Sequence, residues 1–179
     1  VMKRLLLPLS CAALGALLAG LACRFHYGGQ LRRAQQAKLI LISKQEMKLR
    51  VIDYKGTELF TAGIACGLNY GDKQKPGDMK TPEGVFTVSD IHDSRSWTHD
   101  FRDGKGEIKG AYGPHFIRLD VPGHKGIGIH GTHDSLSLGT RATEGCVRLK
   151  NEDLEKLIPL VEVPMTVVIT PSAEDVRKN

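Results

Sequence analysis

Residues 126–149 read GIGIHGTHDSLSLGTRATEGCVRL, two short apolar runs separated by a polar segment. In the first run, isoleucines alternate with glycines up to His130, a period of two that predicts a half-buried strand. The second run begins at Cys146, directly after Gly145. Residues 131–144 between the runs are rich in Gly, Ser and Thr, which predicts a loop that reverses the chain. The two strands are therefore expected to lie side by side, with the histidine near the cysteine.

A histidine beside a cysteine indicates nucleophilic catalysis. A thiol is a weak nucleophile at neutral pH, whereas a thiol that can pass its proton to an imidazole is a strong one. Attack on a carbonyl also creates an oxyanion, which needs preorganised hydrogen-bond donors. The nearest donors in the sequence are the backbone N–H groups of Gly145 and Cys146 and the side chain of Arg148. Gly145, which has no side chain, is also expected to let a substrate backbone approach the sulfur.

Three segments of this stretch, IHGT, SLG and ATEGCVRL, resemble the signature of the L,D-transpeptidase catalytic domain, also called the YkuD domain. The resemblance implies an enzyme that acts on peptidoglycan stem peptides. Its cysteine attacks the carbonyl of the L-residue before a terminal D-amino acid, expels that residue, and passes the acyl group to an amine of another stem. Carbapenem antibiotics are implied as acylating agents. The alternatives are an L,D-carboxypeptidase, which uses water as the acceptor, and a non-catalytic cell-wall-binding module of the same fold.

The same resemblance assigns roles to individual residues. Cys146 is the nucleophile, His130 is the base, and the backbone carbonyl of Gly131 orients the imidazole. Many members of the family have a histidine where this chain has Glu144, so the role of Glu144 is left open. An alternative role for Thr143 is hydrogen bonding to its neighbours at the entry of a strand. The residues expected to contact the substrate or the oxyanion are Arg148, Gly145, Thr143 and His133.

The cysteines and histidines allow two other kinds of site. A disulfide between Cys66 and Cys146 would remove the nucleophile, but Cys66 lies in an apolar run, which favours a buried free thiol. A metal site would draw on His124, His130, His133 and Cys146, but no carboxylate completes the set. No metal and no cofactor are therefore expected. His133 remains an alternative base, or a loop residue that lines the cleft.

The N-terminal residues predict export from the cytoplasm. Lys3 and Arg4 precede a long apolar run with almost no charge, a pattern typical of a signal peptide or a membrane anchor. This predicts a location in the extracytoplasmic cell envelope, with membrane contact if the segment is not cleaved, and it excludes nucleic acid as a partner. The predicted order is a signal peptide or membrane anchor at 1–24, a polar linker at 25–37, the catalytic domain at 38–171 and a C-terminal tail at 172–179.

Composition and strand pattern predict one mainly β domain. The chain is 41% hydrophobic and 25% charged, as is ordinary for a globular protein, and its net charge of +5 suits an anionic cell wall. Short apolar runs between Gly and Pro turns predict a β-sandwich or open barrel with one or two short helices, in agreement with the resemblance. Residues 92–114 are expected to form a long surface loop, and Asn151 to cap a helix that ends at residue 160. Besides the two strands of the motif, strands are predicted at 39–43, 47–53, 58–67, 85–91, 115–121 and 165–170.

Overall fold

The computed structural model describes residues 24, 26, 28–30, 37–102, 104 and 106–178. The chain divides into two units, 1–37 and 38–179. In the first unit, the described residues up to residue 30 are helical. No helix within the described residues is long and apolar enough to cross a membrane. The predicted export segment (1–24) and most of the predicted linker (25–37) lie outside the described residues.

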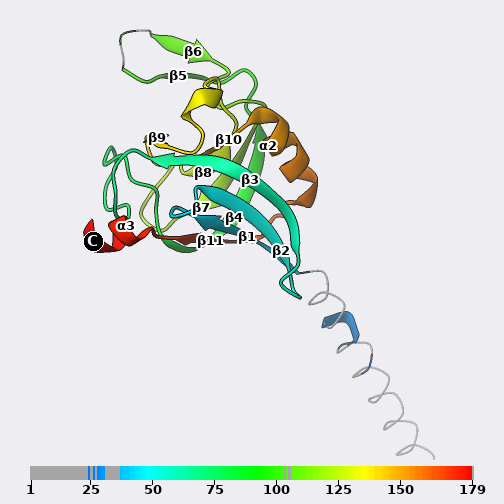
Figure 1. Ribbon diagram of the computed structural model, residues 1–179. Coiled ribbons are helices and arrows are strands. Elements are labelled where there is room, and N and C mark those ends of the chain that lie inside the picture. Colours follow the sequence, from blue (N-terminus) through cyan, green and yellow to red (C-terminus); the bar gives the residue numbers. More distant parts are fainter. Residues whose placement is uncertain are drawn as a thin grey trace, which may run out of the picture. The chain divides into compact units, whose positions relative to one another are not determined.

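The described part of the second unit is a strand-rich domain with four short helical segments (Figure 1). The strands are β1 (Lys38–Ser43), β2 (Lys48–Asp53), β3 (Glu58–Gly67), β4 (Gly84–Asp93), β5 (Thr98–Asp100), β6 (Glu107–Lys109), β7 (His115–Asp120), β8 (Gly128–His130), β9 (Arg141–Thr143), β10 (Val147–Leu149) and β11 (Thr166–Thr170). The helices are α2 (Asn151–Leu157) and α3 (Ala173–Lys178), with 3₁₀ turns η1 (Ser135–Ser137) and η2 (Ile158–Leu160).

The main sheet closes on itself. Its order is β10-β8-β7-β4-β11-β1-β2-β3-β9, and an additional pairing of β10 with β3 joins the first strand of this order to the eighth. The result is a closed barrel, and β9 pairs with the last two residues of β3 (Figure 1). The prediction of a mainly β fold with few short helices is confirmed.

Alternating side chains of the strands form the core. In β1, Ile40 and Ile42 are fully buried while their neighbours stay partly exposed, as a period of two requires. Leu154 and Leu157 of α2 are also fully buried and belong to the same core cluster. Each such side chain contributes roughly 1.5–3 kcal/mol of transfer free energy. The motif strands share this support, because their fully buried residues include Ile129, Val147 and Leu149.

The two motif strands, β8 and β10, run parallel, so the predicted reversal of the chain between them is wrong. Val147 pairs with Ile129, and Arg148 pairs with His130, in a parallel register. Parallel neighbours need a crossover connection of about a dozen residues or more. Here the connection contains η1 and β9, and β9 pairs with β3. The two strands are neighbours as expected, but through a crossover.

Residues 92–114 contain a β-hairpin where a long loop was predicted. β4 continues to Asp93, and β5 and β6 then pair with each other in antiparallel register. They form a separate two-stranded sheet that makes no strand pairing with the barrel in the described part of the chain. In Figure 1 the hairpin lies beside the yellow η1 segment, and the rings of Phe101 and His133 are in contact at 5.1 Å. Three-residue strands of mixed polarity are too short to show a period.

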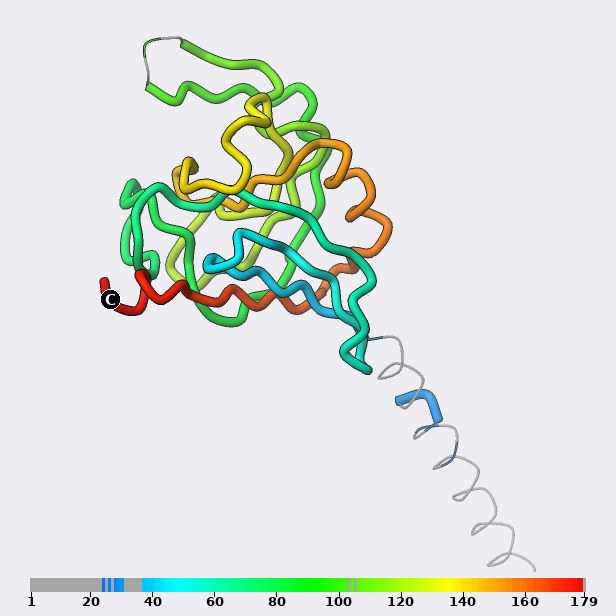
Figure 2. Tube along the Cα trace, in the orientation of Figure 1, coloured from blue at the N-terminus to red at the C-terminus, as the bar shows by residue number. Residues whose placement is uncertain are grey.

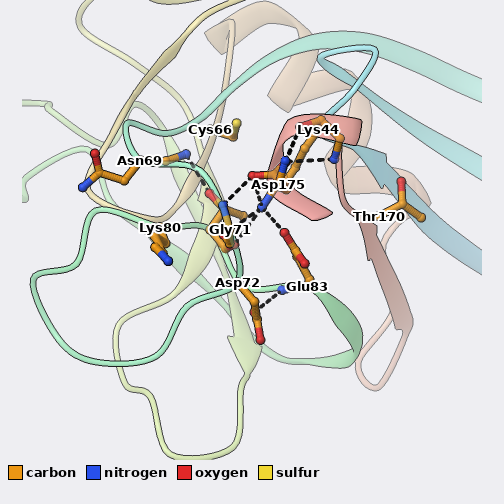
Figure 3. A network of polar contacts seen from close by, with 12 residues as sticks. Lys44, Cys66, Asn69, Gly71, Asp72, Lys80, Glu83, Thr170 and Asp175 are labelled. Atoms are coloured by element: carbon orange, nitrogen blue, oxygen red, sulfur yellow. Dashed lines mark hydrogen bonds and ion pairs between the residues drawn. The ribbon is translucent and has the colours of Figure 1, made fainter. Parts of the chain in front are cut away.

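A buried ion-pair network ties the C-terminal residues to the loop between β3 and β4 (Figure 3). Lys44 is only 1% exposed, and its Nζ lies 2.6 Å from Glu83 Oε1 and 3.1 Å from Asp175 Oδ1. The same ammonium donates to the carbonyl oxygens of Gly71 and Thr81. These partners compensate the cost of removing the charges from water. The network therefore fixes the position of the loop.

Residues 172–179, predicted as a tail, contain helix α3, which the network holds. Asp175 is fully buried, and it accepts hydrogen bonds from Arg141 Nη2 at 2.6 Å and from the Gly71 N–H at 2.7 Å. In Figure 2 the red C-terminal segment lies next to the green loop that precedes β4. Polar contacts of the buried Asp175 carboxylate and of the Ala173 N–H, which donates to Gln45, hold this short helix in place of an apolar stripe, so hydrophobic periodicity did not reveal it.

Candidate active site

The register of β8 and β10 places Cys146 and His130 on the same face of the sheet. Since Val147 is level with Ile129, Cys146 is level with Gly128, two residues before His130. Residues two apart along a strand point to one face. With strands about 4.8 Å apart and a rise of about 3.3 Å per residue, the two Cα atoms are roughly 8 Å apart. Gly128 has no side chain, and the ring of Phe116 fills the space beside it, since a Cβ on Gly128 would lie only 2.4 Å from Cε1 of that ring.

Both side chains line a pocket of about 320 Å³. Its other walls come from the loop before β4, from the β5–β6 hairpin with the residues that follow it, and from the turn before β8. Many of these wall residues are aromatic or basic. The predicted site residues that line the pocket are Cys146, His130, Arg148 and Thr143, whereas Gly131, Gly145 and His133 do not.

His130 is held by the backbone and by two aromatic rings. Its Nδ1 lies 2.6 Å from the carbonyl oxygen of Gly131. Because a carbonyl only accepts, Nδ1 carries the hydrogen, and in the neutral ring Nε2 is the unprotonated nitrogen. The ring stacks on Phe116 with centroids 5.6 Å apart and meets Tyr112 edge-on at 5.0 Å. The side chain is buried at 4% exposure, so its orientation is fixed before any substrate arrives.

Asn151 shapes the turn after His130. Its Oδ1 accepts the N–H of Thr132 at 2.8 Å, and a Cβ on Gly131 would lie only 2.2 Å from that oxygen. The predicted role of Asn151 as a helix cap is wrong, because the N-cap of α2 is Lys150 and no side chain caps the helix. Asn151 instead supports the backbone that contacts the imidazole.

His130 and Cys146 are both uncharged at neutral pH. Burial lowers the pKa of the His130 imidazole from 6.5 to about 3, although the hydrogen bond to Gly131 acts in the opposite direction. Burial likewise raises the pKa of the Cys146 thiol from 9.0 to about 11, against the opposing effect of a backbone hydrogen bond with Gly128. The sulfur also lies 3.3 Å from the carbonyl oxygen of Gly126. The resting site therefore holds a neutral pair and no preformed thiolate–imidazolium.

This protonation state predicts slow alkylation of Cys146 at neutral pH. Iodoacetamide reacts with the thiolate, so the rate at Cys146 should rise about tenfold per pH unit and level off near the thiol pKa of about 11. Peptide mapping by mass spectrometry after timed labelling gives the rate at this residue. The fully buried Cys66 in the same samples reports any unfolding. A midpoint near neutral pH would show a preformed ion pair instead.

The turn before Cys146 is fixed by Thr143 and Gly145. Thr143 Oγ1 donates to the carbonyl oxygen of Cys146 at 2.6 Å and accepts the N–H of Gly145 at 3.2 Å. Gly145 has a φ of +134°, and a Cβ there would lie 2.8 Å from the carbonyl oxygen of Lys80. The positive φ and the backbone of Lys80 therefore both require glycine here, and the approach of a substrate backbone stays a prediction. Thr143 makes the local hydrogen bonds of its alternative role.

Arg148 and His133 occupy different environments. Arg148 is 4% exposed, and its Nη1 donates to Ser137 Oγ at 2.9 Å. Its Nε is buried without a hydrogen-bond partner in the described part of the chain, and burial lowers the pKa of the guanidinium. A buried donor without a hydrogen bond is costly, so the hydrogen-bonding capacity of this guanidinium is not fully used in the described part of the chain. His133 is exposed, packs on Phe101 and is not part of the pocket lining.

The structure forms neither of the two alternative sites. Cys66 and Cys146 are both free, and Cys66 is fully buried with its sulfur 3.8 Å from the sulfur of Met47. Burial raises the pKa of the Cys66 thiol, which makes it unreactive. Among the described residues, no group of three or more His, Cys, Asp or Glu side chains is arranged to hold a metal ion.

Residues 37–169 match the family model of the L,D-transpeptidase catalytic domain, YkuD. The chain belongs to this family. Among curated relatives, the candidate L,D-transpeptidase YqjB of Bacillus subtilis (strain 168) is 32% identical over 134 residues. The match covers 73% of this chain and 70% of YqjB.

Solved structures show the same L,D-transpeptidase fold. The helical cell shape determining protein Pgp2 (K307A mutant) of Campylobacter jejuni is 25% identical with a TM-score of 0.58, over 78% of this chain and 48% of that one. L,D-transpeptidase 3 of Mycobacterium tuberculosis, in complex with a faropenem-derived adduct, is 19% identical with a TM-score of 0.56, over 75% of this chain and 60% of that one. The chain thus spans about half the length of these solved proteins.

Lys73 is a pocket residue of this L,D-transpeptidase domain that motif analysis missed. It is 7% exposed, and its Nζ would lie 3.4 Å from a Cβ on Gly145. It pairs with Asp78 at 2.8 Å. Burial alone would raise the pKa of Asp78, but Lys73 and three backbone N–H groups outweigh it and hold that pKa well below its usual range. Nothing in the sequence distinguished Lys73 from the other lysines of its loop.

Tyr112 and His99 also line the pocket and were missed. The Tyr112 hydroxyl lies 3.0 Å from His99 Nδ1, and His99 Nε2 lies 3.0 Å from Glu144 Oε2. Both residues belong to the region predicted as a long surface loop. The signal was present, because histidine and aromatic residues are concentrated at 97–116. Only the folded structure shows that they line the same pocket as Cys146.

Proposed function

We propose that this domain is an L,D-transpeptidase that works through an acyl-enzyme on Cys146. The observation that carries the proposal is one pocket lined by Cys146 and His130, with the His130 tautomer set by Gly131. As the thiol attacks the substrate carbonyl, Nε2 of His130 takes its proton and the S–C bond forms. The imidazolium then protonates the departing amine. The neutral resting pair suits this sequence, because no charge has to be buried before substrate arrives.

The oxyanion of the donor reaction is assigned to Arg148 and to the backbone N–H of Cys146. Arg148 lines the pocket and has an unpartnered buried Nε. The N–H of Gly145 is already bonded to Thr143, so it is the least available of the predicted donors. Removal of one oxyanion donor typically lowers kcat by about 10²–10³.

Lys73 is the group that we assign to the free carboxylate of the terminal D-residue. This ammonium has three N–H donors, and Asp78 occupies one of them. A terminal carboxylate follows the scissile carbonyl by one residue, and Lys73 lies beside Gly145, next to the nucleophile. A cation at this place favours stems with a free C-terminus over internal peptide bonds.

Lys73→Gln is therefore expected to lower kcat/KM for a donor with a free terminal carboxylate by about 10- to 100-fold, the equivalent of one charge-assisted hydrogen bond of about 1.5–3 kcal/mol. The same donor with a terminal amide should react equally well with both enzymes. Steady-state kinetics with the two donors measures the ratio. Lys75→Gln, which changes a lysine of the same loop outside the pocket lining, is the matched control. An equal loss on both donors would assign Lys73 a purely structural role.

We also propose the cellular context. Residues 1–24 act as a signal peptide or membrane anchor, 25–37 as a linker and 38–171 as the catalytic domain, so the reaction takes place in the extracytoplasmic cell envelope. Peptidoglycan stem peptides serve as donor and acceptor. The faropenem-derived adduct of the Mycobacterium tuberculosis relative supports acylation of Cys146 by β-lactams, including carbapenems.

Intact-mass spectrometry tests the proposed function. The protein is incubated with a disaccharide tetrapeptide, alone and with an amine acceptor. An acyl adduct on Cys146 together with cross-linked product supports the transpeptidase. An adduct with only tripeptide as the product favours the L,D-carboxypeptidase. Absence of adduct and product in a folded protein with a free thiol would overturn the proposal in favour of a binding module.

A further inference from the structure

A row of three polar side chains, joined by hydrogen bonds, lies in the wall of the pocket. It runs from Glu144 through His99 to Tyr112, and both contacts measure 3.0 Å. All three residues line the pocket together with Cys146. They come from three segments: the turn before β10, strand β5 and the stretch before β7. The fold therefore brings a carboxylate, an imidazole and a phenol into line beside the proposed nucleophile.

The donor and the acceptor of each hydrogen bond in this row of side chains can be assigned. The Glu144 carboxylate only accepts, so Nε2 of His99 carries a hydrogen and donates it. In the neutral imidazole, Nδ1 is then the acceptor, and the hydroxyl of Tyr112 donates to it. This leaves the lone pairs of the Tyr112 oxygen for a donor in the pocket. A ligand that carries an N–H group, and above all a cation, fits that requirement.

Tyr112 is held close to the reacting groups. Its ring meets the His130 ring edge-on at 5.0 Å, and its backbone carbonyl accepts the N–H of Gly131 at 2.8 Å. The pKa of its hydroxyl is raised first by burial and then by the Cys146 thiolate, which forms only at high pH, and by the Glu144 carboxylate. Tyr112 is therefore close enough to Cys146 and to Glu144 for their ionised forms to affect the pKa of its hydroxyl.

A purely structural role does not account for this arrangement. The side chain of Glu144 is 44% exposed and that of His99 is 26% exposed. Ion pairs at such exposed positions add little to stability. Their alignment toward a half-buried phenol in the pocket instead suits the handling of a proton.

We propose that Tyr112, His99 and Glu144 form the site for the acceptor amine and remove the extra proton of its ammonium form. This inference rests on the proposed transpeptidase function. An amine acceptor reaches the enzyme as an ammonium ion, which has no lone pair with which to attack the acyl-enzyme. His130 alone accepts only the proton that is released during the attack. A second group is needed for the first proton.

The proton transfers balance. The acceptor ammonium donates to the Tyr112 oxygen, whose own proton passes to Nδ1 of His99, and the resulting imidazolium is stabilised by Glu144. The neutral amine then attacks the thioester carbonyl, so that the N–C bond forms and the C–S bond breaks. The proton from the attacking nitrogen passes through His130 to the sulfur of Cys146. His99, which is partly exposed, returns its proton to water.

The test separates acylation from aminolysis. Wild type, Tyr112→Phe and Glu144→Gln are acylated with the tetrapeptide donor, and the acyl-enzyme is then mixed with one of two acceptors. Nα-acetyl-lysine carries an ammonium at neutral pH, whereas hydroxylamine is already uncharged. Glu107→Gln removes an exposed carboxylate on β6 of the same hairpin, which does not line the pocket, and is the matched control.

With Nα-acetyl-lysine, Tyr112→Phe and Glu144→Gln should each lower the aminolysis rate about a hundredfold at neutral pH. This is the lower end of what a positioned base contributes. The loss should shrink as pH rises toward the acceptor pKa of about 10.4. With hydroxylamine, the rates should stay within about twofold of wild type, which also shows that the variants are folded. An equal loss of aminolysis rate with both acceptors, or no loss with the ammonium acceptor, would overturn the proposed role of Tyr112, His99 and Glu144 in removing the proton. If wild type forms no acyl-enzyme, the proposed function itself fails, which is a separate outcome.

Discussion

Cys146→Ala is expected to form no acyl-enzyme and no product, and to remain folded. The sulfur is the atom that forms the proposed covalent bond, and the side chain is only partly buried. Its removal therefore costs little packing, and the free energy of unfolding should change by less than about 1 kcal/mol. Intact-mass spectrometry measures the adduct, and urea unfolding measures the stability.

Cys66→Ala is the matched control for this substitution. It removes the other thiol of the domain, which is fully buried and lies outside the pocket lining. The adduct should form as in wild type, while stability falls by roughly 0.5–3 kcal/mol. Turnover by Cys146→Ala would contradict the assignment of the nucleophile.

His130→Gln is expected to lower the rate of acylation by about 10²–10⁴, the contribution of a positioned general base. In the wild type, the low pKa of His130 sets the pH dependence. The imidazole gains a proton only as pH approaches about 3, so the base stays available while pH falls through the usual value of 6.5. Acylation should therefore change little between pH 7 and pH 5. Stopped-flow or quenched-flow mass spectrometry over this range measures it.

The same variant tests the burial of the imidazole. Between pH 6.5 and about 3, the unfolded chain binds a proton at residue 130 that the folded domain excludes. The stability of the wild type should therefore fall with pH across this window, and His130→Gln should remove that part of the loss. An acylation profile that declines with a midpoint near 6.5 would contradict a neutral buried base. Unchanged acylation in His130→Gln would transfer the role to another residue.

The sequence predicted those features that depend on local pattern. The period of two located most strands, including β3 at residues 58–67 and β1 near 39–43. The motif residues Cys146 and His130 were expected to lie close together, and the structure places both on one pocket. In each case, the information lies within a few neighbouring residues.

The features that were missed depend on contacts between distant segments. The connection between the parallel strands β8 and β10 contains β9, whose partner is the distant strand β3, and the polar segment 131–144 does not indicate that partner. Gly145 is required by a carbonyl of another loop. Asp175 is buried because Lys44, far away in the sequence, is buried with it. Side-chain type alone did not indicate any of these partners.

The barrel and the separate β5–β6 sheet contribute different residues to the pocket and are held by different strand pairings. The proposed nucleophile and its proposed base lie at β10 and β8 of the closed barrel, where the paired strands hold them in place. The hairpin pairs only with itself in the described chain, yet it supplies His99 and Phe101 to the pocket. Its length and sequence can therefore change without breaking a strand pair of the barrel, so the proposed acceptor site can be altered while the proposed nucleophile and base stay in place.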